Sequence, residues 1–135
     1  MSNLVIVDSD VWSEGFRKVQ GEPTPHLLML RQLVTEGRVQ MLGCIRQEVL
    51  QGLKSAATFE RIRDQLQAFP DVALTERDYE RAAKFFNLCR SKGIQGSSTD
   101  FLICASSVSY GLPVLTKDKD FDLYAQHLPL QLVKV

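Results

Sequence analysis

The sequence predicts an α/β fold, with a mostly parallel sheet of about five short strands and helices on both faces. Short apolar runs alternate along the chain with longer segments whose apolar residues recur at helical spacing. The run at residues 4–7 is apolar at every position and mostly β-branched, which is typical of a strand buried on both faces. No linker or repeat divides the 135 residues, so we expect residues 1–135 to form one domain.

Each predicted strand is a short run rich in Val, Leu or Ile. In chain order the predicted strands cover residues 4–7, 39–42, 71–74, 112–116 and 130–135. The segments between them are helical, so the strands should run parallel and end at a common edge of the sheet. Sheets of this kind bind their ligands beyond the carboxyl ends of the strands.

The predicted helices cover residues 24–37, 44–55, 58–68, 75–92 and 97–111. Gly37, Gly93 and Gly111 mark C-terminal ends. The helix at 75–92 is the most clearly defined, because Thr75 and Asp78 form a capping box at its start. Its predicted apolar stripe consists of Tyr79, Ala82, Ala83 and Phe86.

Composition excludes several classes of protein. Sixteen acidic side chains balance sixteen basic ones, so there is no global basic field, although a local basic rim remains compatible with this balance. The three cysteines are far apart and odd in number, which indicates reduced thiols rather than disulfides or a zinc site. The first residues, "MSNLVIVD", have no basic region and only a four-residue apolar run, so we expect no signal peptide. No apolar stretch approaches the ~20 residues that span a bilayer. We therefore expect a cytoplasmic protein with no membrane partner.

Many of the acidic residues are of the kind that exposed helix faces normally carry, among them Asp64, Glu76, Asp78 and Glu80. Five others are not. Asp8 directly follows the first strand, and Asp118 and Asp120 follow the strand at 112–116, so all three should lie at the carboxyl edge of the sheet. Glu48 borders the apolar stripe of its helix, and Asp100 lies on the same helix face as Ile103 and Cys104.

Each of these acids also has an ordinary structural explanation. Asp8 can cap the short helix that follows it, and Asp100 fits a capping box at the start of its own helix. Glu48 can extend to solvent from the edge of its stripe. Asp118 and Asp120 can belong to a charged turn.

Together these acids predict a metal site. Crowded carboxylates repel one another strongly unless a multivalent cation lies among them. Ligands that are all oxygen select hard cations, so we expect Mg²⁺ or Mn²⁺ rather than zinc. His26 and His127 lie outside the pattern, and we expect both at the surface.

The opening "VIVDSDV" also matches the D-x-D motif of haloacid-dehalogenase-like phosphatases, in which Asp8 would be the nucleophile and Asp10 the general acid. The segment "PVLT" could be that family's second motif. That family requires a further acidic motif and a lysine downstream, whereas the acids near Thr116 lie in the same loop. This alternative therefore explains less of the chain.

The chain resembles the PIN-domain ribonucleases, and in particular the VapC-like toxins of bacterial toxin–antitoxin modules. The resemblance covers essentially the full length. It runs through "LVIVDSDVW", "IRQEVLQGL", "SSTDFLICASSVSYGLPVLTKDKDF" and the closing strand. It implies a PIN-like, three-layer α/β/α arrangement of the predicted elements.

The resemblance implies that the metal-binding, catalytic acids are Asp8, Glu48, Asp100 and Asp118. Asp120 is a candidate auxiliary ligand, and Ser9 and Thr116 match hydroxyl positions near the family's site. Asp10 departs from the pattern, since many family members carry a neutral residue there. We assign it no role from the sequence.

The implied activity is Mg²⁺- or Mn²⁺-dependent endonucleolytic hydrolysis of RNA, leaving 3′-hydroxyl and 5′-phosphate ends. An acidic pocket repels RNA, so basic residues around it must bind the phosphates. Arg46, Lys117 and Lys119 are nearest in sequence to the acids, although solubility explains them equally well. The resemblance also implies a cognate antitoxin and a homodimer. The alternative, a regulatory PIN-fold module that binds a protein with little catalysis, would not need the complete acid set.

Overall fold

The computed structural model has a parallel sheet of three short strands in the order β2-β1-β3. It describes residues 3–17 and 20–135. The central strand β1 (Val5–Val7) pairs with β2 (Val39–Gln40) on one side and β3 (Val114–Leu115) on the other. All three positions of β1 are buried, as its uninterrupted apolar run predicted.

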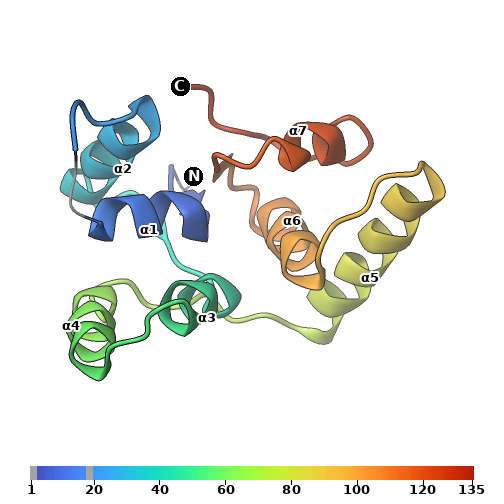
Figure 1. Cartoon of the computed structure of the whole chain (residues 1–135). Helices are drawn as coiled ribbons and strands as arrows, with labels where there is room; N and C mark the ends of the chain where they lie inside the picture. Colours follow the sequence, from blue (N-terminus) through green and yellow to red (C-terminus); the bar gives the residue numbers. More distant parts are fainter. Residues whose placement is uncertain (1–2, 18–19) are drawn as a thin grey trace.

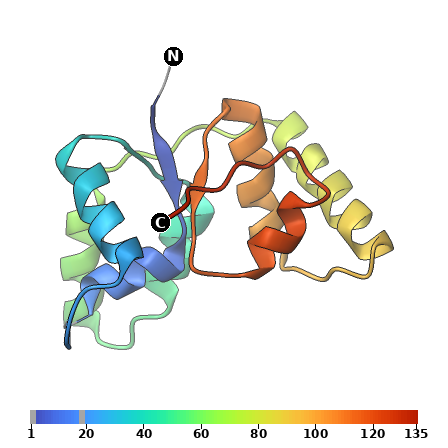
Figure 2. The ribbon, with the colours of Figure 1, turned by 90° about the horizontal axis from the view of Figure 1, so that it is seen from above.

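Helices cover both faces of this sheet. They are α1 (Ser9–Phe16), α2 (Pro25–Thr35), α3 (Gly43–Gln51), α4 (Ala56–Leu66), α5 (Glu76–Ser91), α6 (Ser98–Tyr110) and α7 (Asp120–Ala125). Figure 1 shows α1, α2 and α4 on one side of the strands and α5, α6 and α7 on the other. In Figure 2, β1 descends between these two groups. The predicted three-layer α/β/α fold is confirmed. None of the described helices is long and apolar enough to cross a bilayer.

The sheet is narrower than the five strands that the sequence predicted. The two outer predicted strands, at 71–74 and 130–135, are reduced to single parallel bridges, which join Asp71 to Met41 and Leu132 to Val114. These bridges continue the order β2-β1-β3 outward on each side. Pro70 and Pro129 directly precede the two segments. Because proline has no amide hydrogen to donate, it limits pairing at these edges.

The core lies between the strands and the inner faces of the helices. Its largest fully buried side chains include Ile6, Leu33, Ile45, Ile103, Leu115 and Tyr124. The helix α6 is buried along most of its length and packs between the sheet and α5. This packing sets the start of α6 close to the carboxyl end of β1, where the predicted site residues lie.

The buried face of α5 is shifted by about one residue from the face that the sequence predicted. Its capping box is confirmed, but Asp78 is buried rather than exposed, and its carboxylate accepts a hydrogen bond from Ser109 on α6. Tyr79, predicted to be in the stripe, is 57% exposed. The buried positions of α5 are Asp78 and Cys89, while Ala82 of the predicted stripe is half-buried. A carboxylate paired to a hydroxyl can be buried, which a count of apolar residues does not anticipate.

The helix α7 was not predicted, because residues 118–120 look like a charged turn. Its charged residues lie outside, while Phe121 and Tyr124 point into the core. These two aromatic rings pack against each other with their centroids 5.1 Å apart. A single apolar pair spaced by three is too short a pattern to identify a helix from sequence.

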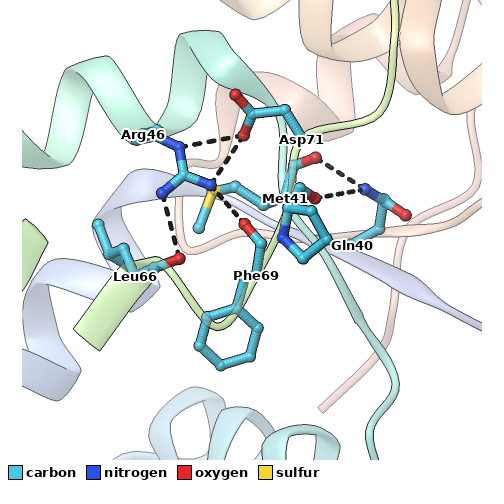
Figure 3. Close-up of polar contacts among 7 residues, drawn as sticks. Gln40, Met41, Arg46, Leu66, Phe69 and Asp71 are labelled. Carbon is cyan, nitrogen blue, oxygen red and sulfur yellow. Dashed lines mark hydrogen bonds and ion pairs between the residues drawn. The ribbon is translucent and has the colours of Figure 1, made fainter. Parts of the chain in front are cut away.

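Arg46 on α3 fixes the chain that follows α4 against the edge of the sheet (Figure 3). Its Nε and Nη2 donate to Oδ1 of Asp71 at 3.1 and 2.9 Å, and its other hydrogen bonds go to the carbonyls of Leu66 and Phe69. Gln40 adds hydrogen bonds to the carbonyls of Met41 and Pro70. This network anchors α3, which carries Glu48. It also engages the guanidinium of Arg46 in hydrogen bonds within the fold.

Gly96, just before α6, lies where no side chain would fit. A methyl group there would overlap the hydroxyl of Tyr124 and come within 2.9 Å of a Phe101 ring carbon. Both rings are buried in the core and pack with centroids 4.8 Å apart. The absence of a side chain at Gly96 therefore permits the observed position of Tyr124.

We predict that Gly96→Ala destabilises the protein by about 1–3 kcal/mol, because an extra methyl group forces buried rings apart. Thermal or urea unfolding measures the change. The matched control is Gly52→Ala, where the added atom would meet only the carbonyl oxygens of Glu48 and Val49, both at an ordinary contact distance of 3.8 Å. Equal stability of the two variants would show that the Tyr124 packing is not as tight as described.

Candidate active site

Asp8 lies at the carboxyl end of β1 and is only 6% exposed. Its Oδ1 accepts a hydrogen bond from the amide of Ser9 at 2.7 Å, so Asp8 does cap α1. Its Oδ2 accepts a hydrogen bond from the hydroxyl of Thr116, which follows β3, at 2.8 Å. The carboxylate thus joins two neighbouring strand ends, and its capping role leaves it at the sheet edge.

Glu48 reaches the same region from α3. Its Oε1 accepts a hydrogen bond from the hydroxyl of Ser9 at 3.2 Å. Ser9 therefore connects two of the predicted acids: its amide binds Asp8 and its hydroxyl binds Glu48. Both hydroxyl residues named from sequence, Ser9 and Thr116, hold carboxylates in place.

Asp100 lies in the first turn of α6. The hydroxyl of Ser97 caps this helix by accepting the amide of Asp100 at 3.0 Å. The carboxylate of Asp100 faces α7 instead, and its Oδ2 accepts a hydrogen bond from the hydroxyl of Tyr124 at 2.7 Å. Tyr124 is a site residue that the sequence did not identify, since it belongs to the helix that was not predicted.

Asp118 and Asp120 lie in the exposed turn between β3 and the start of α7. The amide of Asp118 donates to the Thr116 hydroxyl at 3.1 Å, and Asp118 itself accepts from the amide of Asp120 at 2.9 Å. The predicted charged turn therefore exists, and Thr116 joins it directly to Asp8.

Asp10 also belongs to this region, although we assigned it no role from the sequence. Its Oδ2 accepts a hydrogen bond from the amide of Lys117 at 3.0 Å. Its Oδ1 is buried and accepts no hydrogen bond from the described part of the chain. The only available signal was its position, two residues after Asp8 at the end of a buried strand.

The acids act on one another electrostatically. Burial, and then the charges of Asp10 and Glu48, raise the pKa of Asp8 to about 7, although hydrogen bonds from Thr116 and Ser9 oppose the shift. Burial, and then Asp100 and Asp10, raise the pKa of Glu48. Burial also raises the pKa of Asp10, with a smaller contribution from Asp118. We refer to Asp8, Asp10, Glu48, Asp100 and Asp118 as the acid cluster.

The acid cluster fits a hydrated hard cation. Within residues 3–17 and 20–135, no three Asp, Glu, His or Cys side chains are arranged so that they could hold a metal ion directly. Mg²⁺, however, usually keeps several waters and binds through one or two carboxylates. The donors are all oxygens, burial and then the charges of Asp10 and Glu48 raise the pKa of Asp8, and Asp10 Oδ1 has no partner among the described residues. A cation would relieve all of these unfavourable features.

A cleft of about 660 Å³ adjoins the acid cluster on the side of Thr116 and Asp118. Its basic lining residues are His26, Lys117, Lys119 and Lys134. We call it the lysine cleft. The ammonium of Lys117 lies 3.0 Å from Oε1 of Glu14, whereas Lys119 and Lys134 are exposed. His26, expected merely at the surface, lines this cleft, but Arg46 is not among its lining residues.

Comparison with known proteins agrees with this geometry. A family model described as "PIN domain" matches residues 5–126. A VapC ribonuclease of Mycobacterium bovis (Mb1587) is 26% identical over 132 residues, which cover 95% of this chain and 96% of the relative. Ribonuclease VapC11 of Mycobacterium tuberculosis matches with the same identity and coverage.

Solved structures share the fold at low sequence identity. FitAcB from Neisseria gonorrhoeae has a TM-score of 0.75 and 16% identity, covering 97% of each chain. VapBC2 from Rickettsia felis, solved with a fragment of promoter DNA, has a TM-score of 0.74 and 12% identity, covering 96% of this chain and 97% of the other. The family match spans most of the sequence and includes every member of the acid cluster, so the chain belongs to the PIN-domain family.

Proposed function

We propose that this protein is a metal-dependent endoribonuclease and the toxin of a toxin–antitoxin pair. The observation that carries the proposal is the acid cluster, in which carboxylates come from the ends of two strands and from three helices. Burial and then neighbouring members of the cluster raise the pKa values of Asp8, Asp10 and Glu48. Relatives named as VapC ribonucleases support the substrate class. We further propose that Asp8, Glu48, Asp100 and Asp118 hold Mg²⁺ or Mn²⁺, with Asp120 as an auxiliary ligand.

A bound divalent ion would supply an acidified water and positive charge next to the phosphorus for in-line hydrolysis. The protein's own contribution is orientation. Thr116 holds Oδ2 of Asp8, Ser9 holds Oε1 of Glu48, and Tyr124 holds Oδ2 of Asp100. Partners of this kind fix the geometry of carboxylate ligands, and their loss typically costs about 10–100-fold in metal affinity or activity.

The RNA backbone would lie in the lysine cleft. Lys119 and Lys134 are exposed and line a cavity that also contains Asp118, so they can bind phosphates next to the acids. Lys117 is already paired with Glu14 and would contribute less. Arg46 is engaged with Asp71 and backbone carbonyls, so we assign the phosphate contacts to the lysines rather than to Arg46.

We propose a cognate antitoxin protein and a second copy of this chain as partners. The solved structures that share the fold include VapBC-5, a member of the VapBC family of toxin–antitoxin systems from Mycobacterium tuberculosis, and a toxin–antitoxin complex from Klebsiella pneumoniae. A toxin should stop the growth of a bacterial host when it is expressed without its antitoxin. Relief of that arrest by Asp8→Asn would tie the toxicity to the acid cluster.

We predict that Asp8→Asn and Asp100→Asn each lower the rate of RNA cleavage by more than about 100-fold, because loss of a metal ligand exceeds the loss of an outer partner. Thr116→Val should lower it by about 10–100-fold. The assay is cleavage of a panel of purified RNAs with Mg²⁺ or Mn²⁺, in the presence and absence of EDTA.

The matched control is Asp64→Asn, an exposed acid on α4 whose side chain pairs with its neighbour Arg63. It should cleave like the wild type. Cleavage that survives EDTA, or that survives substitution of Asp8, would rule out the proposed mechanism.

We also predict a pH-dependent stability difference that needs no RNA. The pKa of Asp8 is about 7 in the fold against 3.8 for the unperturbed group, so between these values the folded protein binds a proton that the unfolded chain does not. The contribution of Asp8 to the free energy of unfolding therefore falls as the pH rises from about 4 to about 7. Metal-free Asp8→Asn should thus be more stable than the wild type at pH 8, on the order of 2 kcal/mol, but not at pH 4.5.

Thermal unfolding at the two pH values measures this difference. Mg²⁺ at pH 8 should raise the melting temperature of the wild type, since a ligand that binds only the folded state stabilises it. The increase should be smaller for Asp8→Asn. A stability difference between the two proteins that is the same at both pH values would contradict the assignment.

Charge removal in the lysine cleft should weaken RNA binding without slowing chemistry. We predict that Lys119→Ala and Lys134→Ala raise the KM, leave kcat unchanged, and each reduce the salt slope of binding by about 1. Lys92→Ala, at the exposed end of α5, is the control. If Lys119→Ala and Lys134→Ala had the same KM as Lys92→Ala, the RNA backbone would lie outside the lysine cleft.

A further inference from the structure

A second cavity, of about 540 Å³, lies between α3, α5 and α6. The described residues that line it include no charged side chain. They combine aromatic rings, side-chain amides and hydroxyls, represented by Tyr79, Phe86, Gln47, Asn87, Ser98 and Thr99. We call this cavity the uncharged groove. Its volume lies within the roughly 300–1,000 Å³ typical of small-ligand sites.

The uncharged groove adjoins the acid cluster. Gln47 and Thr99 directly precede Glu48 and Asp100 in the chain. Cys44, which also lines the groove, lies one helical turn before Glu48 on the same face of α3. Burial raises the pKa of its thiol to about 11, and the nearby charges of Glu48 and Asp8 add to this shift. A ligand at the acids therefore has the groove beside it.

The lining of the groove selects for a flat, uncharged ligand with polar edges. Tyr79 is 57% exposed, so its ring is accessible at the groove. Phe86 is already fixed, because it packs edge-on against Phe101 with centroids 5.5 Å apart and carries the Arg90 guanidinium 5.4 Å from its ring centre. The Oδ1 of Asn87 accepts from Arg90 at 3.1 Å, which orients its amide.

Phosphate fits this lining poorly, because no charged side chain lines the groove and the neighbouring Arg90 guanidinium is already held by Asn87 and the Phe86 ring. A nucleobase does fit. Proteins that recognise single-stranded RNA stack unpaired bases on aromatic side chains and bind their edges with polar groups. The lysine cleft, by contrast, offers cations.

We propose that the uncharged groove binds one unstacked nucleobase next to the phosphodiester that lies at the acid cluster. The inference rests on the proposed ribonuclease function and extends it to a substrate class, namely RNA with an unpaired base beside the cleaved bond. Tyr79 supplies the stacking surface, while Asn87 and Gln47 contact the edge of the base. These residues would then set the sequence preference of cleavage.

The test uses a single-stranded RNA oligonucleotide that the wild type cleaves at one bond, and versions of it with one base removed at successive positions. Binding is measured by fluorescence anisotropy in an Asp8→Asn background, and cleavage sites are mapped with the otherwise wild-type chain. The variants are Tyr79→Ala, which removes the stacking ring, and Ala83→Trp, which fills the groove. Leu88→Ala is the control, since Leu88 is an exposed apolar residue of α5 that does not line the groove.

We expect removal of one base beside the cleaved bond to weaken binding by about tenfold, in line with the loss of one stacked base. Tyr79→Ala should bind the intact oligonucleotide about tenfold more weakly and should not distinguish it from the version lacking that base. Ala83→Trp should do the same and should change the cleavage sites. Leu88→Ala should behave like the Asp8→Asn background alone.

Three results would overturn the inference. If Tyr79→Ala and Ala83→Trp discriminate the missing base as the background does, and RNA is still cleaved, the groove binds no base although the ribonuclease function stands. If Ala83→Trp changes the oligomeric mass in solution but not the discrimination, the groove is an interface between copies of the chain. If the wild type cleaves no RNA with either metal, the proposed function fails first, and the inference with it.

Discussion

The site depends on holding several carboxylates together at one sheet edge against their mutual repulsion. Asp8 experiences this repulsion in addition to burial, which is the larger cause of the rise in its pKa to about 7. The fold opposes this repulsion with neutral donors, chiefly the hydroxyls of Thr116, Ser9 and Tyr124. The ammonium of Lys117 is paired with Glu14 instead. Hydroxyls orient carboxylates without cancelling their charge, so the negative potential that attracts a cation is preserved.

The acids are positioned largely by residues that carry no charge or lie outside the cluster. Arg46 anchors α3 and thereby the origin of Glu48, through contacts that end at Asp71. Gly96 lets Tyr124 approach closely enough to bind Asp100. Such supports hold the carboxylates of Glu48 and Asp100 at the site, although burial and neighbouring acids raise the pKa of Glu48. A change in either support would displace a carboxylate without altering the set of acids.

The sequence predicted the fold class and the position of the acids at one sheet edge better than the contacts among them. The apolar run before Asp8, and the strand before Thr116, were enough to place both at one sheet edge. Three features could not be predicted. Asp78 is buried because a partner on another helix accommodates it, α7 is defined by only two aromatic residues, and Asp10 matters through a contact with distant Lys117. Each depends on a tertiary neighbour that local patterns do not contain. The prediction of two outer strands was wrong because prolines limit their pairing to single bridges.

The chain has no net charge, yet its charges are unevenly distributed around the site. Cations line the cleft beside Asp118, whereas the groove beside Glu48 and Asp100 is lined by uncharged residues. Contacts to phosphates fix the register of a nucleic acid but carry no sequence information, while contacts to bases do. If RNA occupies both surfaces, the lysines can supply affinity for any strand, and discrimination between strands must come from the aromatic and amide side chains. Affinity and specificity then reside on different segments, the turn between β3 and α7 with the C-terminal segment for the first and α3, α5 and α6 for the second.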